Sequence, residues 1–478
     1  MKYILSDLQK HNTQIVIYFG QVALVAYIFF INQEQINARH FFHADDWAWL
    51  YKAEFMSFKD IFSIFPRAIY NDRPVGAITI KALYQIFGLN SQGFLYFQIL
   101  LHILNCFLIY FISKKYIGNY SALIVGALAG SWFVANNAVF WTAAIFDLLG
   151  ATLCLLVIFF WQKTQTKKHI MFYSIVGAFI YFLAIRTKEF SLGLPVLLFI
   201  MSTTLDKKSI IQTLQLLVPF IIVMFVFGAR YIYLLFYSGT SLLNNSDSSY
   251  GLHFSGILDN IWFYFSKSFY SDAFGLFGVY AVLFSFVLIG IITPRIRMIL
   301  FFCLSGYLIL LGPTLLLSSQ LSALYLYAPH FFLAFAVGGL FLAERYWKIF
   351  GFIISLALII MPPSSKLYHN GLNFHEAKSS VNRDQFNAFI SLFDVIEKDS
   401  TIFISGVERY HNPFSYGPGN SVKINNNDTS LKFKLERPFG ELKAEFCETA
   451  PPKYFIDFKG VKAINKTQVI TESCEPPL

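Results

Sequence analysis

The stretch AVFWTAAIFDLLGATLCLLVIFFW, residues 138–161, decides the fold class of this chain. Its 24 residues contain one charged side chain, Asp147. About 20 consecutive apolar residues are enough for an α-helix to cross the hydrocarbon core of a bilayer. The stretch therefore predicts a membrane-spanning helix.

Ten further apolar runs of similar character occur along the chain. They cover residues 15–31, 94–112, 120–135, 170–185, 190–205, 210–236, 273–292, 298–317, 323–343 and 349–361. The composition agrees, because 56% of the residues are hydrophobic and only 14% are charged, against about 25% charged in soluble domains. Lys2 and Lys10 precede the first run as in a signal peptide, but no small-residue cleavage site follows it, so we expect it to remain as a helix. The sequence predicts a polytopic α-helical membrane protein with about eleven transmembrane helices.

The distribution of Lys and Arg predicts the orientation. With the N-terminus in the cytoplasm, the cytoplasmic segments carry a net charge of +10, although the whole chain carries only +9. Basic residues gather on the cytoplasmic side of membrane proteins, so the positive charge has a topological cause and does not indicate nucleic-acid binding. Eleven spans place the C-terminal end outside the cytoplasm. We expect a multi-pass membrane protein with its N-terminus in the cytoplasm.

Two domains are predicted. Residues 1–361 form the transmembrane domain, with external loops at 32–93 and 237–272, and residues 362–478 form a small extracytoplasmic α+β domain. Amphipathic stretches in the first loop predict a platform that lies on the membrane surface. The polar start of the second loop suits a mobile lid. In the C-terminal domain we predict a helix at 382–398 and strands at 401–406, 421–425, 431–435 and 453–458.

Three of the five cysteines, Cys106, Cys154 and Cys303, fall in predicted spans and suit apolar packing. Cys447 and Cys474 lie in the C-terminal domain, where an external compartment permits a disulfide. Two thiols alone do not complete a metal site, so a disulfide is the better interpretation of this pair.

The segment FFHADDWAWLYKAEF, residues 41–55, places two carboxylates side by side just after the first span. Either Asp45 or Asp46 could cap the helix that WAWLYK predicts. Adjacent helical residues point about 100° apart, so capping accounts for only one of them. The other could accept a proton from an attacking hydroxyl, and the pair could instead bind a divalent cation such as Mg²⁺ or Mn²⁺.

Lys and Arg usually gather in cytoplasmic segments, so basic residues in external loops suggest a function. Arg73 lies in YNDRPVG, and Arg186 and Lys188 lie beside Glu189 in AIRTKEFSLG. These cations suit the oxygens of a phosphate group. The alternative for Arg73 is an ion pair with Asp72 or another loop carboxylate. The alternative for Arg186 and Lys188 is pairing with Glu189 together with contacts to lipid headgroups.

Polar residues inside the predicted spans are weaker signals. We expect Asp147 and Arg230 to pair with each other and His102 to form a hydrogen bond between helices. In SALYLYAPH, residues 322–330, we expect Tyr325 and Tyr327 to anchor at the membrane interface, with stacking on a ligand as the alternative.

The order HADDW, DRPV, RTKEF and YLYAPH, over residues 40–330, resembles the GT-C glycosyltransferases, and most of all the branch with the protein O-mannosyltransferases and the TMTC-type mannosyltransferases. In the TMTC-type pattern, Glu and Arg stand where this chain has Ala323 and Leu324. The resemblance implies a polyprenyl-phosphate-linked sugar as donor and a single inverting displacement. It implies a base or metal ligand at Asp45 or Asp46. Arg73, Arg186 and Lys188 would then surround the phosphate, supported by Glu189, His102, Tyr325 and Tyr327.

The sequence thus predicts a membrane glycosyltransferase that acts on an extracytoplasmic glycan, lipid or protein. A transporter or flippase for lipid-linked sugars is one alternative, although transporters usually show related halves and this chain shows no such symmetry. A scaffold without catalytic activity, whose C-terminal domain binds an envelope partner, is the other.

Overall fold

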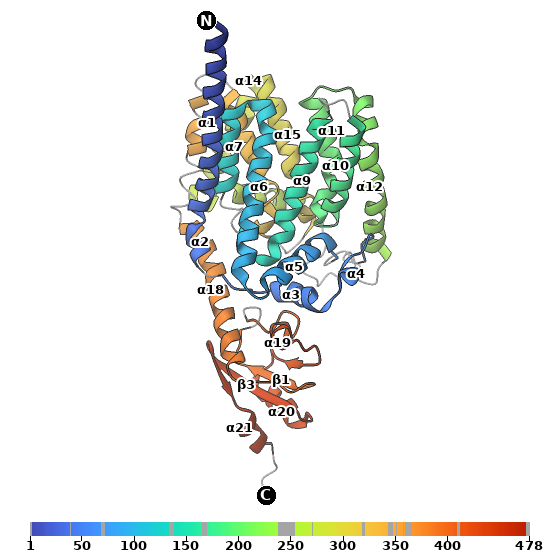
Figure 1. Cartoon of the computed structure of the whole chain (residues 1–478), viewed down its shortest axis with the longest axis vertical. Helices are drawn as coiled ribbons and strands as arrows, with labels where there is room; N and C mark the ends of the chain where they lie inside the picture. Colours follow the sequence, from blue (N-terminus) through green and yellow to red (C-terminus); the bar gives the residue numbers. More distant parts are fainter. Residues whose placement is uncertain are drawn as a thin grey trace.

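A computed structural model gives the three-dimensional structure of the protein. It describes residues 2–38, 40–67, 72–132, 138–164, 170–237, 254–269, 271–317, 321–342, 348–349, 351–356, 358, 366–408 and 412–474. A helical bundle forms one part of the molecule, and a small domain with a β-sheet lies at one end of it (Figure 1). The fold is that of a multi-pass membrane protein with a soluble C-terminal domain.

The bundle helices follow the predicted apolar runs. They are α1 (Lys2–Ile31), α6 (Ser91–Ile117), α7 (Asn119–Ser131), α9 (Ile145–Lys163), α10 (Ile170–Ile185), α11 (Leu194–Thr204), α12 (Ile210–Tyr237), α14 (Ser271–Ile292), α15 (Pro294–Leu311) and α16 (His330–Gly339). Among the described residues, five helical segments are long and apolar enough to cross a membrane, and four shorter apolar helices accompany them. The eleventh predicted run, 349–361, lies partly outside the described residues, so the number of spans stays a prediction.

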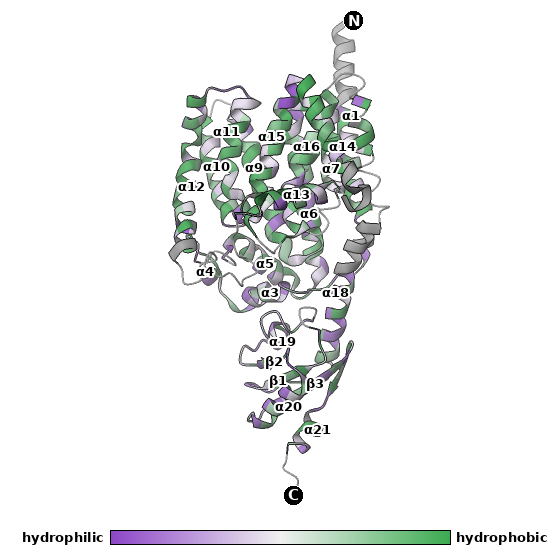
Figure 2. Cartoon of the chain, turned by 180° about the vertical axis from the view of Figure 1, so that it is seen from behind, coloured by the Kyte–Doolittle hydropathy of each residue, from purple (hydrophilic) through white to green (hydrophobic). Residues whose placement is uncertain are grey.

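The bundle helices consist mostly of hydrophobic residues (Figure 2), and many of these are exposed. Phe19 is 76% exposed, Phe284 67% and Ile222 58%. Exposure of this extent is unfavourable in water but suits contact with lipid. Inside, small residues let helices approach closely, as at Gly130 on α7, where a Cβ atom would come within 2.7 Å of Ile28 on α1.

The first loop forms the expected platform at one end of the bundle. Its helices are α2 (Gln33–Asn37), α3 (Asp46–Phe55), α4 (Phe58–Ile61) and α5 (Pro74–Phe87). Figure 1 shows α3, α4 and α5 between the bundle and the C-terminal domain, and we call this the platform end. Ser57 and Asp60 form a capping box at the start of α4. Pro74 opens α5, a position where its missing N–H costs no hydrogen bond.

Basic residues gather at the opposite end of the bundle. Lys115, near the end of α6, lies 2.6 Å from Asp206, which follows α11. Arg295, at the start of α15, donates a hydrogen bond to the Tyr116 carbonyl at 3.0 Å. These contacts bring together three connections that the sequence assigned to the same side of the membrane. We call this the basic end.

The C-terminal domain is built on a four-stranded sheet of order β2-β1-β3-β4. Its elements are α18 (Lys366–Ile390), β1 (Thr401–Ser405), α19 (Asn420–Asn426), β2 (Lys432–Lys434), α20 (Phe439–Glu448), β3 (Lys453–Lys459), β4 (Lys462–Asn465) and α21 (Thr467–Glu472). β1 is parallel to β2 and β3, and β4 is antiparallel to β3. The α+β prediction is confirmed.

Three details of the predicted C-terminal domain are wrong. The predicted helix 382–398 ends at Ile390. The predicted strand 421–425 is helix α19, which contacts α3 of the platform and buries Val422 and Ile424. Strand β4, absent from the prediction, pairs with β3 across a turn at Gly460, whose φ of +65° favours glycine. The disulfide between Cys447 and Cys474 is present, with a Cα–Cα distance of 5.4 Å.

Candidate functional site

The two adjacent carboxylates of the platform have different surroundings. Asp46 is buried and its Oδ2 accepts the His43 N–H at 2.9 Å, while its Oδ1 accepts the Ala143 N–H at 2.6 Å. The second bond fastens the start of α3 to the bundle, 97 residues further along the chain. Asp46 therefore has the structural role at the start of α3. From the sequence, either Asp45 or Asp46 could have had that role.

Asp45 stands at the N-cap position of α3, but its side chain makes no capping hydrogen bond. The side chain of Asp45 is exposed at the surface, but the protein packed around it removes part of its hydration and raises its pKa above the usual range, and the positive charges of Arg73 and Lys188 act in the opposite direction. Its carboxylate thus lies in the field of two of the predicted phosphate-binding cations. A carboxylate with a raised pKa and free oxygens is suited to accept a proton.

Arg73 forms a bidentate ion pair with Glu189. The Arg73 Nε lies 3.0 Å from Glu189 Oε1, and its Nη2 lies 2.9 Å from Oε2. Both side chains are about one-sixth exposed. The pair joins the start of α5 to the 3-10 helix η2 (Glu189–Gly193), so it fixes the platform on the bundle.

Lys188 pairs with Asp147, a residue of α9. The Lys188 ammonium lies 3.0 Å from Asp147 Oδ2 and 5.7 Å from the centre of the Tyr325 ring. Burial, together with the charge of Arg73, lowers the pKa of Lys188, and the charges of Asp147 and Glu189 counteract this decrease. Arg73, Lys188 and Asp45 are therefore electrostatic neighbours, although they come from three separate parts of the chain.

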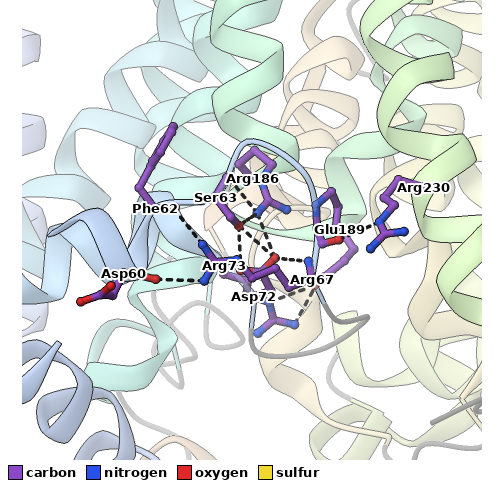
Figure 3. Close-up of polar contacts among 10 residues, drawn as sticks. Asp60, Phe62, Ser63, Arg67, Asp72, Arg73, Arg186, Glu189 and Arg230 are labelled. Atoms are coloured by element: carbon purple, nitrogen blue, oxygen red, sulfur yellow. Dashed lines mark hydrogen bonds and ion pairs between the residues drawn. The ribbon is translucent and has the colours of Figure 1, made fainter. Parts of the chain in front are cut away.

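The third predicted cation, Arg186, is completely buried. Figure 3 shows its guanidinium facing Ser63 and Asp72. The Arg186 Nη2 donates to Ser63 Oγ at 2.8 Å and lies 3.1 Å from Asp72 Oδ2. Arg186 thus holds the loop between α4 and α5, and its role at a phosphate remains a prediction.

The same loop has a second attachment, to α12. Arg230 Nε donates to the Pro66 carbonyl at 3.0 Å, and its guanidinium lies 5.1 Å from the centre of the Tyr233 ring. The predicted pairing of Asp147 with Arg230 is therefore wrong, because each has a different partner.

A polar cluster lies deeper in the bundle. The Tyr327 hydroxyl lies 3.0 Å from His102 Nδ1 and accepts a hydrogen bond from Asn105 Nδ2 at 3.0 Å. His102 is buried and links α6 to the segment before α16, as predicted for a hydrogen bond between helices. Tyr327 is fully buried, so its predicted anchoring at the membrane interface is wrong. Tyr325 is half-buried beside Lys188 and remains a candidate for stacking on a ligand.

The residues fit a shared metal site poorly. Both oxygens of Asp46 are committed to backbone N–H groups, which leaves Asp45 as the one uncommitted carboxylate of the pair. Within the described parts of the chain, no group of three or more His, Cys, Asp or Glu residues is placed to hold a metal ion. We therefore assign no reaction step to a metal.

Comparison with known proteins agrees with this fold. Residues 71–233 match the family model described as dolichyl-phosphate-mannose-protein mannosyltransferase. Over the whole bundle and the C-terminal domain, the chain resembles the crystal structure of ArnT from Cupriavidus metallidurans bound to undecaprenyl phosphate, with a TM-score of 0.55 and 12% identity. That alignment covers 94% of this chain and 98% of ArnT. The chain therefore shares the fold of ArnT.

A second ArnT structure from the same organism, in the apo state, matches this chain with a TM-score of 0.51 and 14% identity, over 94% of this chain and 93% of ArnT. No curated protein matches the chain significantly. The matched family segment contains Arg73, Asp147, Arg186, Lys188 and Glu189. Asp45 lies outside it. The narrower resemblance to the TMTC-type branch stays a prediction.

Proposed function

We propose that this protein is a glycosyltransferase of the GT-C superfamily, which transfers a sugar from a polyprenyl phosphate to an acceptor that reaches the platform end. The observation that carries the proposal is the position of Asp45, whose carboxylate lies in the field of Arg73 and Lys188. A base and two cations in one place are what an acceptor hydroxyl and a leaving phosphate require.

The donor phosphate is assigned to Arg73 and Lys188. Arg73 uses Nε and Nη2 for Glu189, so its Nη1 is available for a phosphate oxygen. Lys188 has three N–H donors and gives one to Asp147. Glu189 and Asp147 hold the two cations in place, and the remaining N–H donors of the cations are available to the phosphate. The fold likeness to an ArnT structure bound to undecaprenyl phosphate supports a polyprenyl-phosphate donor.

In the proposed reaction, an acceptor hydroxyl oxygen attacks the anomeric carbon of the donor sugar. The bond from that carbon to the phosphate oxygen breaks, and its electron pair leaves with the polyprenyl phosphate. The hydroxyl proton passes to Asp45. Arg73 and Lys188 stabilise the negative charge that grows on the phosphate, so the base and the cations act on opposite sides of one displacement. A single displacement inverts the anomeric configuration.

The C-terminal domain is placed to contribute to the acceptor side. Phe386 on α18 lies 5.5 Å, ring to ring, from Trp47, which follows the two carboxylates on α3. Asn420 of α19 also contacts the Trp47 carbonyl. An acceptor that approaches the platform therefore passes the C-terminal domain.

We infer that the basic end faces the cytoplasm and that the platform end and C-terminal domain are extracytoplasmic, in a bacterial inner membrane.

The test is transfer by the purified full-length protein in nanodiscs. Undecaprenyl-phosphate sugars are supplied one at a time, with envelope fractions as the acceptor source, and mass spectrometry measures released undecaprenyl phosphate. We expect release with at least one donor, dependent on the acceptor fraction and abolished by Asp45→Asn. Movement of the intact donor across the bilayer without its cleavage would contradict the proposal and favour a transporter.

A further inference from the structure

A second site lies far from the platform, in an apolar groove on the outside of the bundle. Helices α14 and α15 form its walls, and α16 and the end of α13 (Ile257–Ser268) form its floor. The groove has a volume of about 310 Å³. Its volume lies at the lower end of the roughly 300–1,000 Å³ that is typical of ligand sites.

The groove is open to the lipid phase along its walls. Ile291 on α14 is 68% exposed and Phe301 on α15 is 51% exposed, whereas Phe269 and Leu333 on the floor are buried. Gly290 also lines the groove, and a Cβ atom there would make only an ordinary contact of 3.5 Å with Leu300. The absence of a side chain at Gly290 therefore leaves room between the walls. An extended hydrocarbon chain fits such a groove.

One charged residue, Arg297, lines this otherwise apolar groove. It lies in the first turn of α15, at the basic end, and its side chain is exposed. No described residue forms an ion pair or a side-chain hydrogen bond with it, whereas the nearby Arg295 donates to Tyr116. A guanidinium in this position offers its N–H donors to an anionic group at the membrane surface.

We propose that this groove binds an anionic phospholipid of the leaflet at the basic end. One acyl chain lies between α14 and α15, and the headgroup phosphate pairs with Arg297. The charge of Arg297 selects an anionic headgroup, and the apolar walls select a chain. The site is distinct from the donor site, because Arg73 and Lys188 lie at the platform end of the bundle, and it does not depend on the proposed transfer reaction.

Native mass spectrometry of the full-length protein tests the proposal, with phosphatidylglycerol and phosphatidylcholine of identical chains as competing probes. We expect the wild type to retain phosphatidylglycerol preferentially. Arg297→Gln should reduce that preference on the order of tenfold, as expected for the loss of one charge-assisted contact. Arg295→Gln is the matched control, because it removes the same charge two residues away, outside the groove, and should leave the preference intact.

Two groove-filling variants test the position of the chain. Gly290→Leu and Leu304→Trp should both reduce retention of phosphatidylglycerol, while the thermal unfolding temperature shows whether each variant is folded. An unchanged preference in Arg297→Gln would overturn the proposal, as would equal losses in Arg297→Gln and Arg295→Gln. Undecaprenyl phosphate, added as a competitor, should not displace phosphatidylglycerol. If it does so at lower concentration than phosphatidylglycerol itself, the groove belongs to an isoprenoid instead.

Discussion

Arg73 and Glu189, 116 positions apart in the chain, form a bidentate ion pair whose two N–O distances are 3.0 and 2.9 Å. The pair holds the platform on the bundle and also fixes a guanidinium whose charge acts on Asp45. A structural role and the proposed catalytic role therefore coincide in one contact, and experiments must separate them.

Arg73→Gln should lower both stability and transfer. Removing one partner of a largely buried pair leaves the other without compensation, at a cost of about 3–5 kcal/mol. In the double variant Arg73→Gln with Glu189→Gln, neutral amides replace both charges, and the thermal unfolding temperature should return most of the way to that of the wild type. Transfer should not return, because the phosphate still lacks its guanidinium. Recovery of transfer together with stability would show that Arg73 acts only as a structural ion pair.

Arg186 should affect stability more than donor use. It is completely buried against Ser63 and Asp72, so Arg186→Ala should lower the thermal unfolding temperature and expose the loop between α4 and α5 to proteolysis. Arg186→Lys keeps the charge but not the planar fork, and should be destabilised less. In folded Arg186→Lys, the donor concentration for half-maximal rate should stay near the wild-type value. A large increase at unchanged stability would make Arg186 a direct phosphate ligand.

The pH dependence of kcat/KM should report Asp45. The base is active as a carboxylate, so the rate should fall as pH decreases through its pKa, which partial loss of hydration places above the usual range. Lys188 is one of the two cations that hold this pKa down. Lys188→Gln should therefore move the acidic limb to higher pH, whatever its effect on donor affinity. Lys207→Gln, at the basic end, is the control and should leave the pH of the acidic limb unchanged. If Lys188→Gln also leaves it unchanged, the charge of Lys188 does not act on the catalytic base.

The orientation can be checked by labelling engineered cysteines from outside intact cells. From the sequence alone, Ser246 and Thr166 would be labelling positions in loops on opposite sides of the membrane, but both lie outside the described residues. Lys462→Cys on β4 and Lys207→Cys after α11 are therefore better positions. Both side chains are exposed. A thiol reagent that does not cross membranes should label Lys462→Cys and spare Lys207→Cys until the cells are opened. The reverse pattern would place the platform in the cytoplasm, away from any extracytoplasmic acceptor.

Local patterns in the sequence were enough to predict much of this architecture. Apolar runs predicted the bundle helices because burial in lipid depends on composition over about 20 residues. The two adjacent carboxylates and the three cations of the predicted external loops were selected as candidates, because charges beside a membrane need a partner or a function. The strand prediction at 421–425 failed for a tertiary reason: α19 packs on α3, and that contact decides between helix and strand.

The choice of partners could not be predicted. Lys188 pairs with Asp147 across 41 positions, and Asp46 binds the backbone of Ala143 across 97. No sequence pattern marks either pair of residues. The backbone N–H of Ala143, for example, is chemically the same as that of almost any other residue. Tyr327 was placed at the membrane interface on composition alone, whereas its hydroxyl finds His102 and Asn105 inside the bundle. The sequence thus supplied the candidate groups, and the fold decided which of them are committed and which are free.

The most direct test of the account compares Asp45→Asn with Asp46→Asn at saturating donor and acceptor. Asn removes the proton acceptor at Asp45 while the fold keeps its contacts, so turnover should fall by about 10²–10⁴-fold, the usual contribution of a general base, at near wild-type stability. At Asp46, Asn can replace one accepted N–H bond but must lose the other, so Asp46→Asn should lower the thermal unfolding temperature more and turnover less. Full turnover in Asp45→Asn, measured as released undecaprenyl phosphate, would contradict the assignment of Asp45 as the base.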